Sequence, residues 1–151
     1  MINNTLKLPC PEGFHIMDEE EKKEMNIMGS GPVVCMSDPE RHLIVTIGWQ
    51  QVGGFTSMLL KPKDIVKNSE KVIGRSMASY GYQREGFLTR SIAGNPAEGF
   101  AYTYEAKGVP MLGQSWAIKI GKVFYYFHLY ARQELREMSL PVLDEVLDSV
   151  R

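Results

Sequence analysis

The side chains best suited to proton transfer or ligand binding gather on one run, Val-Phe-Tyr-Tyr-Phe-His-Leu-Tyr, from residue 123 to 130. Alternate residues of a strand point to the same face, so Tyr126, His128 and Tyr130 share a face if this run is extended. An imidazole between two phenols can exchange protons near neutral pH or hydrogen-bond a ligand. Large aromatic side chains also dominate hydrophobic cores. The pattern therefore fits either a site or ordinary packing.

Two more tyrosines have a similar arrangement. Tyr102 and Tyr104 share one face of a neighbouring expected strand. If one face of the sheet is incompletely covered, these tyrosines together with Tyr126, His128 and Tyr130 form an amphipathic patch suited to a protein partner or a small ligand. We take these five as the candidate binding residues.

Other catalytic and ligand-binding patterns are missing from the sequence. His15, His42 and His128 show no HxH, HxxxH or HExxH spacing, so ligand spacing gives no support to a zinc site. No G-x-S-x-G nucleophile turn occurs, and the glycine-rich stretches match neither phosphate-binding fingerprint. Glu98 and Glu105 are candidates for carboxylate chemistry only because they flank a strand. We predict no catalytic residue, no metal and no cofactor.

Composition narrows the class of protein further. The 151 residues suit one domain, 1–151, with its own hydrophobic core. Lys and Arg number 17 against 18 acidic residues, and no basic stripe is visible, which argues against nucleic-acid binding. No apolar run approaches the ~20 residues of a membrane span, and the first residues lack a signal-peptide pattern, so we expect a cytoplasmic protein. Cys10 and Cys35 form no CxxC, and we expect buried free thiols.

Hydrophobic periodicity and turn signals predict the elements that position these residues. We expect strands at 33–36, 42–50, 82–92, 100–107, 114–120 and 123–131, a short helix at 18–25 begun by Asp18, a long helix at 62–80, and a terminal helix begun by Ser139. The glycines and proline of 29–32 end the short helix, and 51–60 is expected to be loop with a short strand near 57–60.

The last three strands make an antiparallel meander, and the run 123–131 is apolar on both faces, as a central strand would be. The fold class is α+β: an antiparallel β-sheet with helices packed on its faces.

Several short motifs resemble the PsbP-like family, which includes the photosystem II extrinsic subunit, a Ran-binding import factor and uncharacterised bacterial proteins. The similar segments are Leu8–Phe14, with Pro-Glu-Gly-Phe, then Ile92–Ala97, with Gly-Asn-Pro-Ala, and Gly121–Tyr126, with Gly-Lys-Val-Phe-Tyr-Tyr. Ser149 lies near the place of a serine in the family's closing helix. The resemblance implies an α/β/α sandwich that is used for binding, and it brings no catalytic residues.

Three functional hypotheses follow. The favoured one is a non-enzymatic binding or adaptor domain that contacts a protein partner through a sheet face. The alternative is a small-molecule-binding protein or enzyme with a pocket between the long helix and the sheet, using His128 with tyrosines or Glu105. A homodimer formed through an exposed sheet face or edge is the third.

Overall fold

The computed structural model describes residues 5–24, 33–51 and 59–151. Its strands form one antiparallel sheet of seven, in the order β1-β2-β3-β7-β6-β5-β4. The elements along the chain are β1 (His15–Ile16), α1 (Glu19–Glu24), β2 (Val33–Asp38), β3 (Leu43–Gln51), α3 (Pro62–Ser76), the 3-10 turn η1 (Ala78–Tyr80), β4 (Gln83–Ile92), β5 (Asn95–Ala106), β6 (Val109–Ile120), β7 (Val123–Arg132), the 3-10 turn η2 (Gln133–Leu135) and α4 (Arg136–Asp148).

β7 lies at the centre of the sheet, between β3 and β6. Its residues pair on both sides, so that Tyr130 lies opposite Ile44 of β3 and opposite Gly113 of β6. A strand with neighbours on both edges is largely shielded from solvent: the face that carries Tyr125, Phe127 and Leu129 is fully buried, and the face that carries Tyr126, His128 and Tyr130 is half-buried. The predicted meander and the central position of this strand are confirmed.

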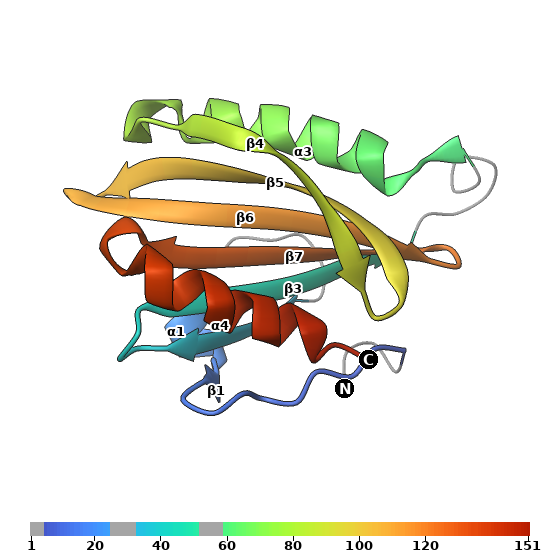
Figure 1. The fold of residues 1–151 in the computed structure, drawn as a ribbon, viewed down its shortest axis with the longest axis horizontal. Helices are drawn as coiled ribbons and strands as arrows, with labels where there is room; N and C mark the ends of the chain where they lie inside the picture. Colours follow the sequence, from blue (N-terminus) through green and yellow to red (C-terminus); the bar gives the residue numbers. More distant parts are fainter. Residues whose placement is uncertain (1–4, 25–32, 52–58) are drawn as a thin grey trace.

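Helices cover the two faces of the sheet, which confirms the α/β/α sandwich. α4 crosses one face, and α3 packs on β5 and β6 from the other (Figure 1). Beneath α4 lies the larger core, built from Leu143, Val146 and Leu147 of the helix and from the alternate residues Tyr125, Phe127 and Leu129 of β7. Burial of these apolar side chains makes the main favourable contribution to the free energy of packing the helix on the sheet.

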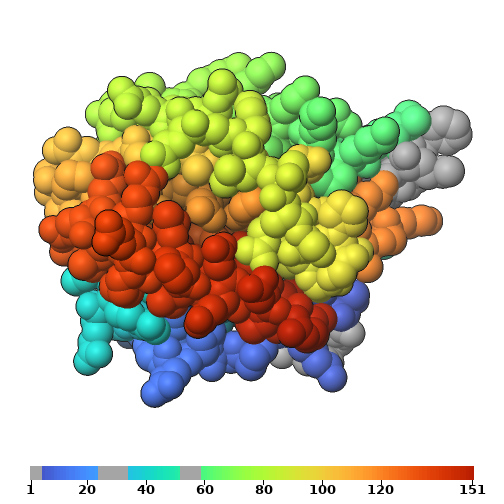
Figure 2. All heavy atoms as spheres, in the orientation of Figure 1, coloured from blue at the N-terminus to red at the C-terminus, as the bar shows by residue number. Residues whose placement is uncertain are grey.

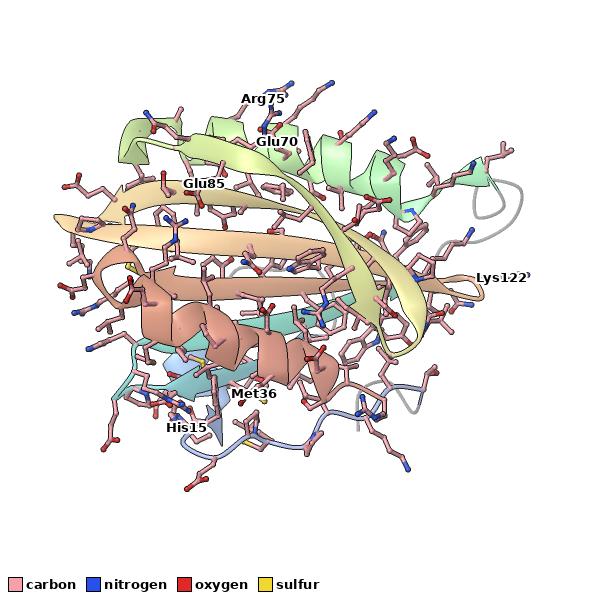
Figure 3. All side chains as sticks on the ribbon, viewed as in Figure 1. His15, Met36, Glu70, Arg75, Glu85 and Lys122 are labelled. Atoms are coloured by element: carbon pink, nitrogen blue, oxygen red, sulfur yellow. The ribbon has the colours of Figure 1, made fainter. Side chains whose placement is uncertain are left out.

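α3 follows its sequence signals closely. The Lys61 backbone N–H donates to Asp64 Oδ2 at 3.3 Å, Pro62 begins the helix, and Gly81, at φ +72°, ends the η1 turn that follows. The predicted helix over 62–80 is thus α3 continued by η1. Tyr82 Oη donates to Glu70 Oε1 at 3.1 Å and holds the helix against the start of β4, and Figure 3 shows Glu70 just above this strand.

The start of α4 differs from the prediction. The helix begins at Arg136, directly after η2, so Ser139 lies inside it and does not cap it. The chain leaves β7 through a 3-10 turn that already sets a helical path, and no side-chain cap is used. Ser139 is instead fully buried, and its hydroxyl has no hydrogen-bond partner in the described part of the chain.

The shorter elements largely agree with the sequence. Asp18 caps α1, since its Oδ1 accepts the Glu21 N–H at 2.9 Å. Both cysteines are free thiols, but Cys10 is exposed, so the expectation of burial holds only for Cys35. The predicted break at 29–32 lies outside the described residues, as does most of the predicted loop at 51–60.

The two ends of the described chain meet beside α4. The Lys7 N–H donates to Arg151 O at 2.6 Å, and the Arg151 N–H donates to Lys7 O at 2.8 Å. The N-terminal segment therefore runs along the border of α4, as Figure 2 shows for the blue and red atoms. Within the described residues, no helix combines the length and apolarity that crossing a membrane requires.

Candidate functional site

The sheet register brings the five predicted site residues to one face. Gly113 of β6 lies between Tyr102 on β5 and Tyr130 on β7, and Ser115, two residues on, lies opposite His128. Because partners across a ladder and alternate residues along a strand share a face, Tyr102, Tyr104, Tyr126, His128 and Tyr130 all point to the side that α3 covers. We call this set the tyrosine face.

Tyr102 is the buried centre of the tyrosine face. Its ring centroid lies 5.8 Å from that of Tyr104, 5.3 Å from that of Tyr82 and 5.5 Å from that of Phe100. The ring lies over Gly113, where a Cβ atom would be 2.3 Å from the Tyr102 Cζ. Glycine at this position therefore lets the tyrosine side chain cross β6 toward β7. The arrangement is a packed aromatic row, as the core interpretation predicts.

Coverage by α3 is uneven across the tyrosine face. Tyr102 is 0% exposed and belongs with Val66 of α3 to a second hydrophobic cluster. Tyr126 packs on the margin of that cluster, and it is only half-buried. His128 and Tyr130, further along β7, are half-buried as well. The middle of the face, at Phe100, Tyr102 and Ala117, is core, whereas Tyr104 at one end of β5 and the three residues of β7 are only half-buried.

His128 is held as a neutral imidazole. Its Nδ1 lies 2.8 Å from Ser115 Oγ, across the β6–β7 ladder. Burial lowers the pKa of His128 to about 4, because the surroundings solvate the imidazolium poorly. At neutral pH the ring is therefore uncharged and a weak base. This state suits hydrogen bonding better than general-base catalysis, for which a pKa near the working pH is best.

The hydroxyl groups around His128 are also uncharged. Burial raises the pKa of Tyr102, Tyr104, Tyr126 and Tyr130 above the ordinary value for a phenol, so all four remain protonated. The Tyr102 hydroxyl lies near Ser115 and Tyr130 but makes no hydrogen bond of normal length and angle within the described residues. The tyrosine face thus presents aromatic rings and neutral hydrogen-bonding groups.

Glu105 is not part of this arrangement. On β5 it alternates with Tyr104, so it lies on the opposite face of the sheet from His128. Nor do three His, Cys, Asp or Glu side chains come together to hold a metal ion anywhere in the described ranges.

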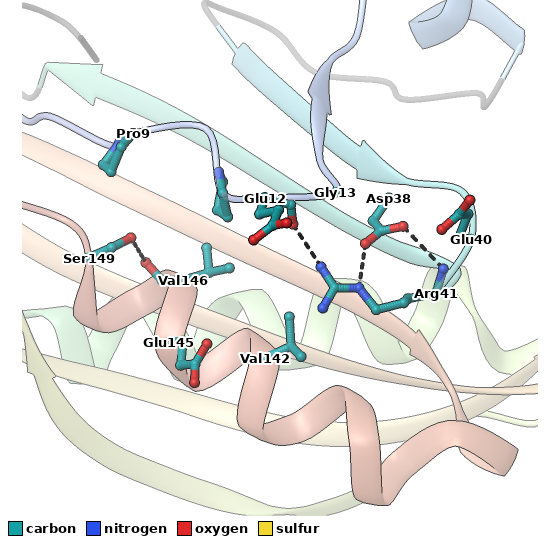
Figure 4. A pocket seen from close by; sticks show the side chains of 11 residues that line it. Pro9, Glu12, Gly13, Asp38, Glu40, Arg41, Val142, Glu145, Val146 and Ser149 are labelled. Atoms are coloured by element: carbon teal, nitrogen blue, oxygen red, sulfur yellow. Dashed lines mark hydrogen bonds and ion pairs between the residues drawn. The ribbon is translucent and has the colours of Figure 1, made fainter.

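A second feature, which the sequence did not indicate, is a groove of about 510 Å³ beside α4 (Figure 4). Its walls come from three distant segments: Pro9–Gly13, the turn at 38–41 between β2 and β3, and the α4 end of the chain at 142–149. Because no repeat or spacing links these segments, only the folded chain brings them together.

An ion pair forms one end of the groove. Arg41 Nε donates to Asp38 Oδ2, the Arg41 backbone N–H donates to Asp38 Oδ1 at 3.1 Å, and a terminal nitrogen of Arg41 donates to Glu12 O at 2.9 Å. Burial alone would raise the pKa of Asp38, but the hydrogen bonds from Arg41 outweigh it and hold the pKa below its ordinary value. The pair ties the N-terminal segment to the β2–β3 turn.

Comparison with known proteins gives a fold and no closer relationship. No family model matches the chain, and no curated protein matches it. Among solved structures, cyanobacterial PsbP (CyanoP) from Synechocystis sp. PCC 6803 is similar with a TM-score of 0.68 and 14% identity, over 100% of this chain and 88% of that one.

Two other solved structures have the same fold. The Saccharomyces cerevisiae Ran-binding protein Mog1p gives a TM-score of 0.61 at 6% identity, over 100% of this chain and 92% of its own. LpqN of Mycobacterium tuberculosis, described as involved in cell envelope biogenesis, gives 0.64 at 13% identity, over 97% and 82%. The fold is therefore the PsbP-like fold that the sequence motifs indicated.

Proposed function

We propose that this chain is a non-enzymatic binding domain that holds a protein partner on the β7 part of the tyrosine face. One observation carries the proposal: Tyr126, His128 and Tyr130 lie half-buried on the central strand and are uncharged at neutral pH. Rings of this kind lose little conformational entropy on binding, and their hydroxyls can hydrogen-bond a partner backbone, which is why tyrosine is frequent among residues that dominate interface energies.

The chemistry of His128 supports binding rather than catalysis. A base with a pKa of about 4 takes up protons poorly at neutral pH, and the carboxylate of Glu105 lies on the other face. The Ran-binding protein with the same fold shows that this scaffold can serve protein recognition, although at 6% identity it says nothing about which partner this chain binds.

Site-specific photo-crosslinking in cells tests the proposal. A photoreactive phenylalanine analogue replaces Tyr126 or Tyr130 in two separate variants, and Tyr80 in a third, because Tyr80 is 52% exposed and lies on η1 outside the tyrosine face. We expect a discrete crosslinked protein from both β7 positions and not from Tyr80. Crosslinks from Tyr80 alone would contradict the proposal. A crosslink to a second copy of the chain would favour the homodimer.

A double variant, Tyr126→Phe with Tyr130→Phe, separates binding from folding. It keeps both rings, including the Tyr126 ring that packs on the second cluster, and removes only the hydroxyls. If these hydroxyls hydrogen-bond the partner, the variant binds the partner more weakly, because each lost hydrogen bond contributes about 1 kcal/mol. The melting temperature of the free variant stays close to that of the wild type.

A small-molecule ligand is the second candidate, and the hydroxyl of Tyr102, which is buried near Ser115 and Tyr130 without a hydrogen bond of normal geometry, favours it. A buried donor without a partner costs free energy that a ligand carbonyl next to the Ser115–His128 pair would recover. A thermal-shift screen of neutral metabolites tests this. A compound that stabilises the wild type and not Tyr102→Phe supports it, and equal stabilisation of both proteins argues against it.

A further inference from the structure

The groove beside α4 has a charge that does not belong to the tyrosine face or to its proposed function. Glu12, Glu40 and Glu145 line it, and none of the three forms an ion pair in the described part of the chain. The one basic residue in its lining, Arg41, is already paired with Asp38. The lining of the groove therefore carries a net negative charge, from three exposed carboxylates.

Apart from Ser149, whose hydroxyl donates to Val146 O, the remaining lining is apolar. Pro9 and Pro11 form one side, and Val142 and Val146 of α4 form the other, where Figure 4 shows both valines directed toward the N-terminal segment. An occupant that suits this surface has an aliphatic stem to lie against the prolines and valines and a positive charge to reach the carboxylates. Lysine and arginine side chains combine these two properties.

The walls of the groove are fixed before anything binds. Gly13, at φ +89°, approaches the ion pair so closely that a Cβ atom would be 2.7 Å from Asp38 Oδ2 and 2.9 Å from a terminal nitrogen of Arg41. Arg41 also lies over the Phe14 ring, with Cζ 5.8 Å from its centroid. A wall tied at several points loses little freedom on binding, which favours affinity.

We propose that this groove binds a lysine- or arginine-containing segment of a protein partner, with the basic side chain on the apolar floor and its charged end among Glu12, Glu40 and Glu145. The volume of about 510 Å³ lies within the range of ligand sites, and it exceeds what a single ion needs. The sign of the charge excludes phosphate groups and acidic peptides. The site is independent of the tyrosine face, which lies on the other side of the sheet.

A peptide titration followed by nuclear magnetic resonance tests the proposal on the full chain. The probes are two acetylated, amidated pentapeptides, Ala-Lys-Val-Lys-Ala and its counterpart with glutamate in place of lysine. We expect the lysine peptide to shift the backbone amides of Cys10, Glu12 and Gly13, those of Asp38, Glu40 and Arg41, and those of residues 142–149, and the glutamate peptide to shift none of them. Raising the salt concentration from 0.05 to 0.5 M weakens the binding, because the contacts are partly solvent-exposed ion pairs.

A matched pair of double variants tests whether the carboxylates of the groove bind the lysine side chains of the peptide. Glu12→Gln with Glu145→Gln removes two charges from the groove, and Glu105→Gln with Glu137→Gln removes two exposed charges elsewhere. We expect the first pair to raise the Kd for the lysine peptide at least about fivefold, and the second pair to leave it within about twofold.

Three results would overturn the proposal: no amide shifts with the lysine peptide, equal shifts with both peptides, or equal weakening in both double variants. The third would mean that net charge alone attracts the peptide. None of these outcomes bears on the photo-crosslinks from Tyr126 and Tyr130, so failure of the groove site and failure of the proposed function remain distinguishable.

Discussion

Ser115 and His128 face each other across the β6–β7 ladder, with Ser115 Oγ 2.8 Å from His128 Nδ1. The pair lies where the sheet passes from the part covered by α3 to the half-buried part of β7. It fixes an imidazole that burial keeps uncharged, and this state makes the stability of the fold depend on pH.

Acid should destabilise the protein through His128 before it acts on the carboxylates. The pKa of His128 is about 4 in the folded chain and 6.5 in the unfolded chain, so the unfolded state binds the proton first as the pH falls. The contribution of the neutral His128 to the free energy of unfolding is therefore fully present above pH 6.5 and is lost progressively as the pH falls to about 4. Its size is on the order of 3 kcal/mol. Urea unfolding between pH 7 and pH 4 measures it.

A His128→Gln variant should lack this part of the pH dependence, whatever its stability at pH 7. His15→Gln is the control, since His15 is an exposed histidine paired with Glu21. This variant should lose as much free energy of unfolding between pH 7 and pH 4 as the wild type does. If His128→Gln and the wild type lose the same free energy of unfolding between pH 7 and pH 4, the imidazole is not held neutral in the fold.

Gly113→Ala should destabilise the protein by about 1–3 kcal/mol, because its Cβ would lie 2.3 Å from Tyr102 Cζ and would displace a buried ring. Gly86→Ala on β4 is the matched control: nothing lies within 4 Å of its Cβ position, so its effect should be small. Urea unfolding compares the two. Similar losses in both variants would mean that Tyr102 does not lie over β6.

Asp38→Asn should cost about 1–3 kcal/mol at pH 7, because Arg41 loses its charged partner at a residue that is 2% exposed. The folded-state pKa of Asp38 is lowered, so its contribution is present above about pH 4 and is lost as the pH falls through the folded value. The difference between wild type and variant should disappear in strong acid. Glu40→Gln, an exposed change in the same turn, should show neither effect.

Ser139→Ala should leave stability unchanged or raise it by up to about 1 kcal/mol, because it removes a buried hydroxyl that has no hydrogen-bond partner. If Ser139 were the N-cap, the same change would cost about 0.5–2 kcal/mol. Thermal unfolding decides between the two. A clear loss would mean that the hydroxyl has a partner after all.

The fold could be predicted largely because its signals are local. The alternation of Tyr126, His128 and Tyr130, the apolar run of β7 and Gly81 after α3 each depend on a few neighbouring residues. The start of α4 could not be predicted in this way. Ser139 is a good cap residue by type, but the turn that leads out of β7 sets the helix start three residues earlier.

The candidate sites show the same division. That the tyrosines share a face follows from alternation together with the strand order, but how far α3 covers that face depends on long-range packing. The groove could not be predicted at all. Asp38 and Arg41 look like ordinary turn residues in the sequence. They become part of a groove only because the fold brings them next to Glu12 and α4, which lie far away along the chain.

The paired backbone of Lys7 and Arg151 holds the two ends of the described chain side by side. A short linker between these two ends, with new termini opened in the β5–β6 hairpin at Lys107 and Gly108, would give a circular permutant that keeps every strand pairing except the contacts of that turn. The order in which the strands are synthesised would then change while their order in the sheet stays the same, and both the groove and the tyrosine face would remain intact.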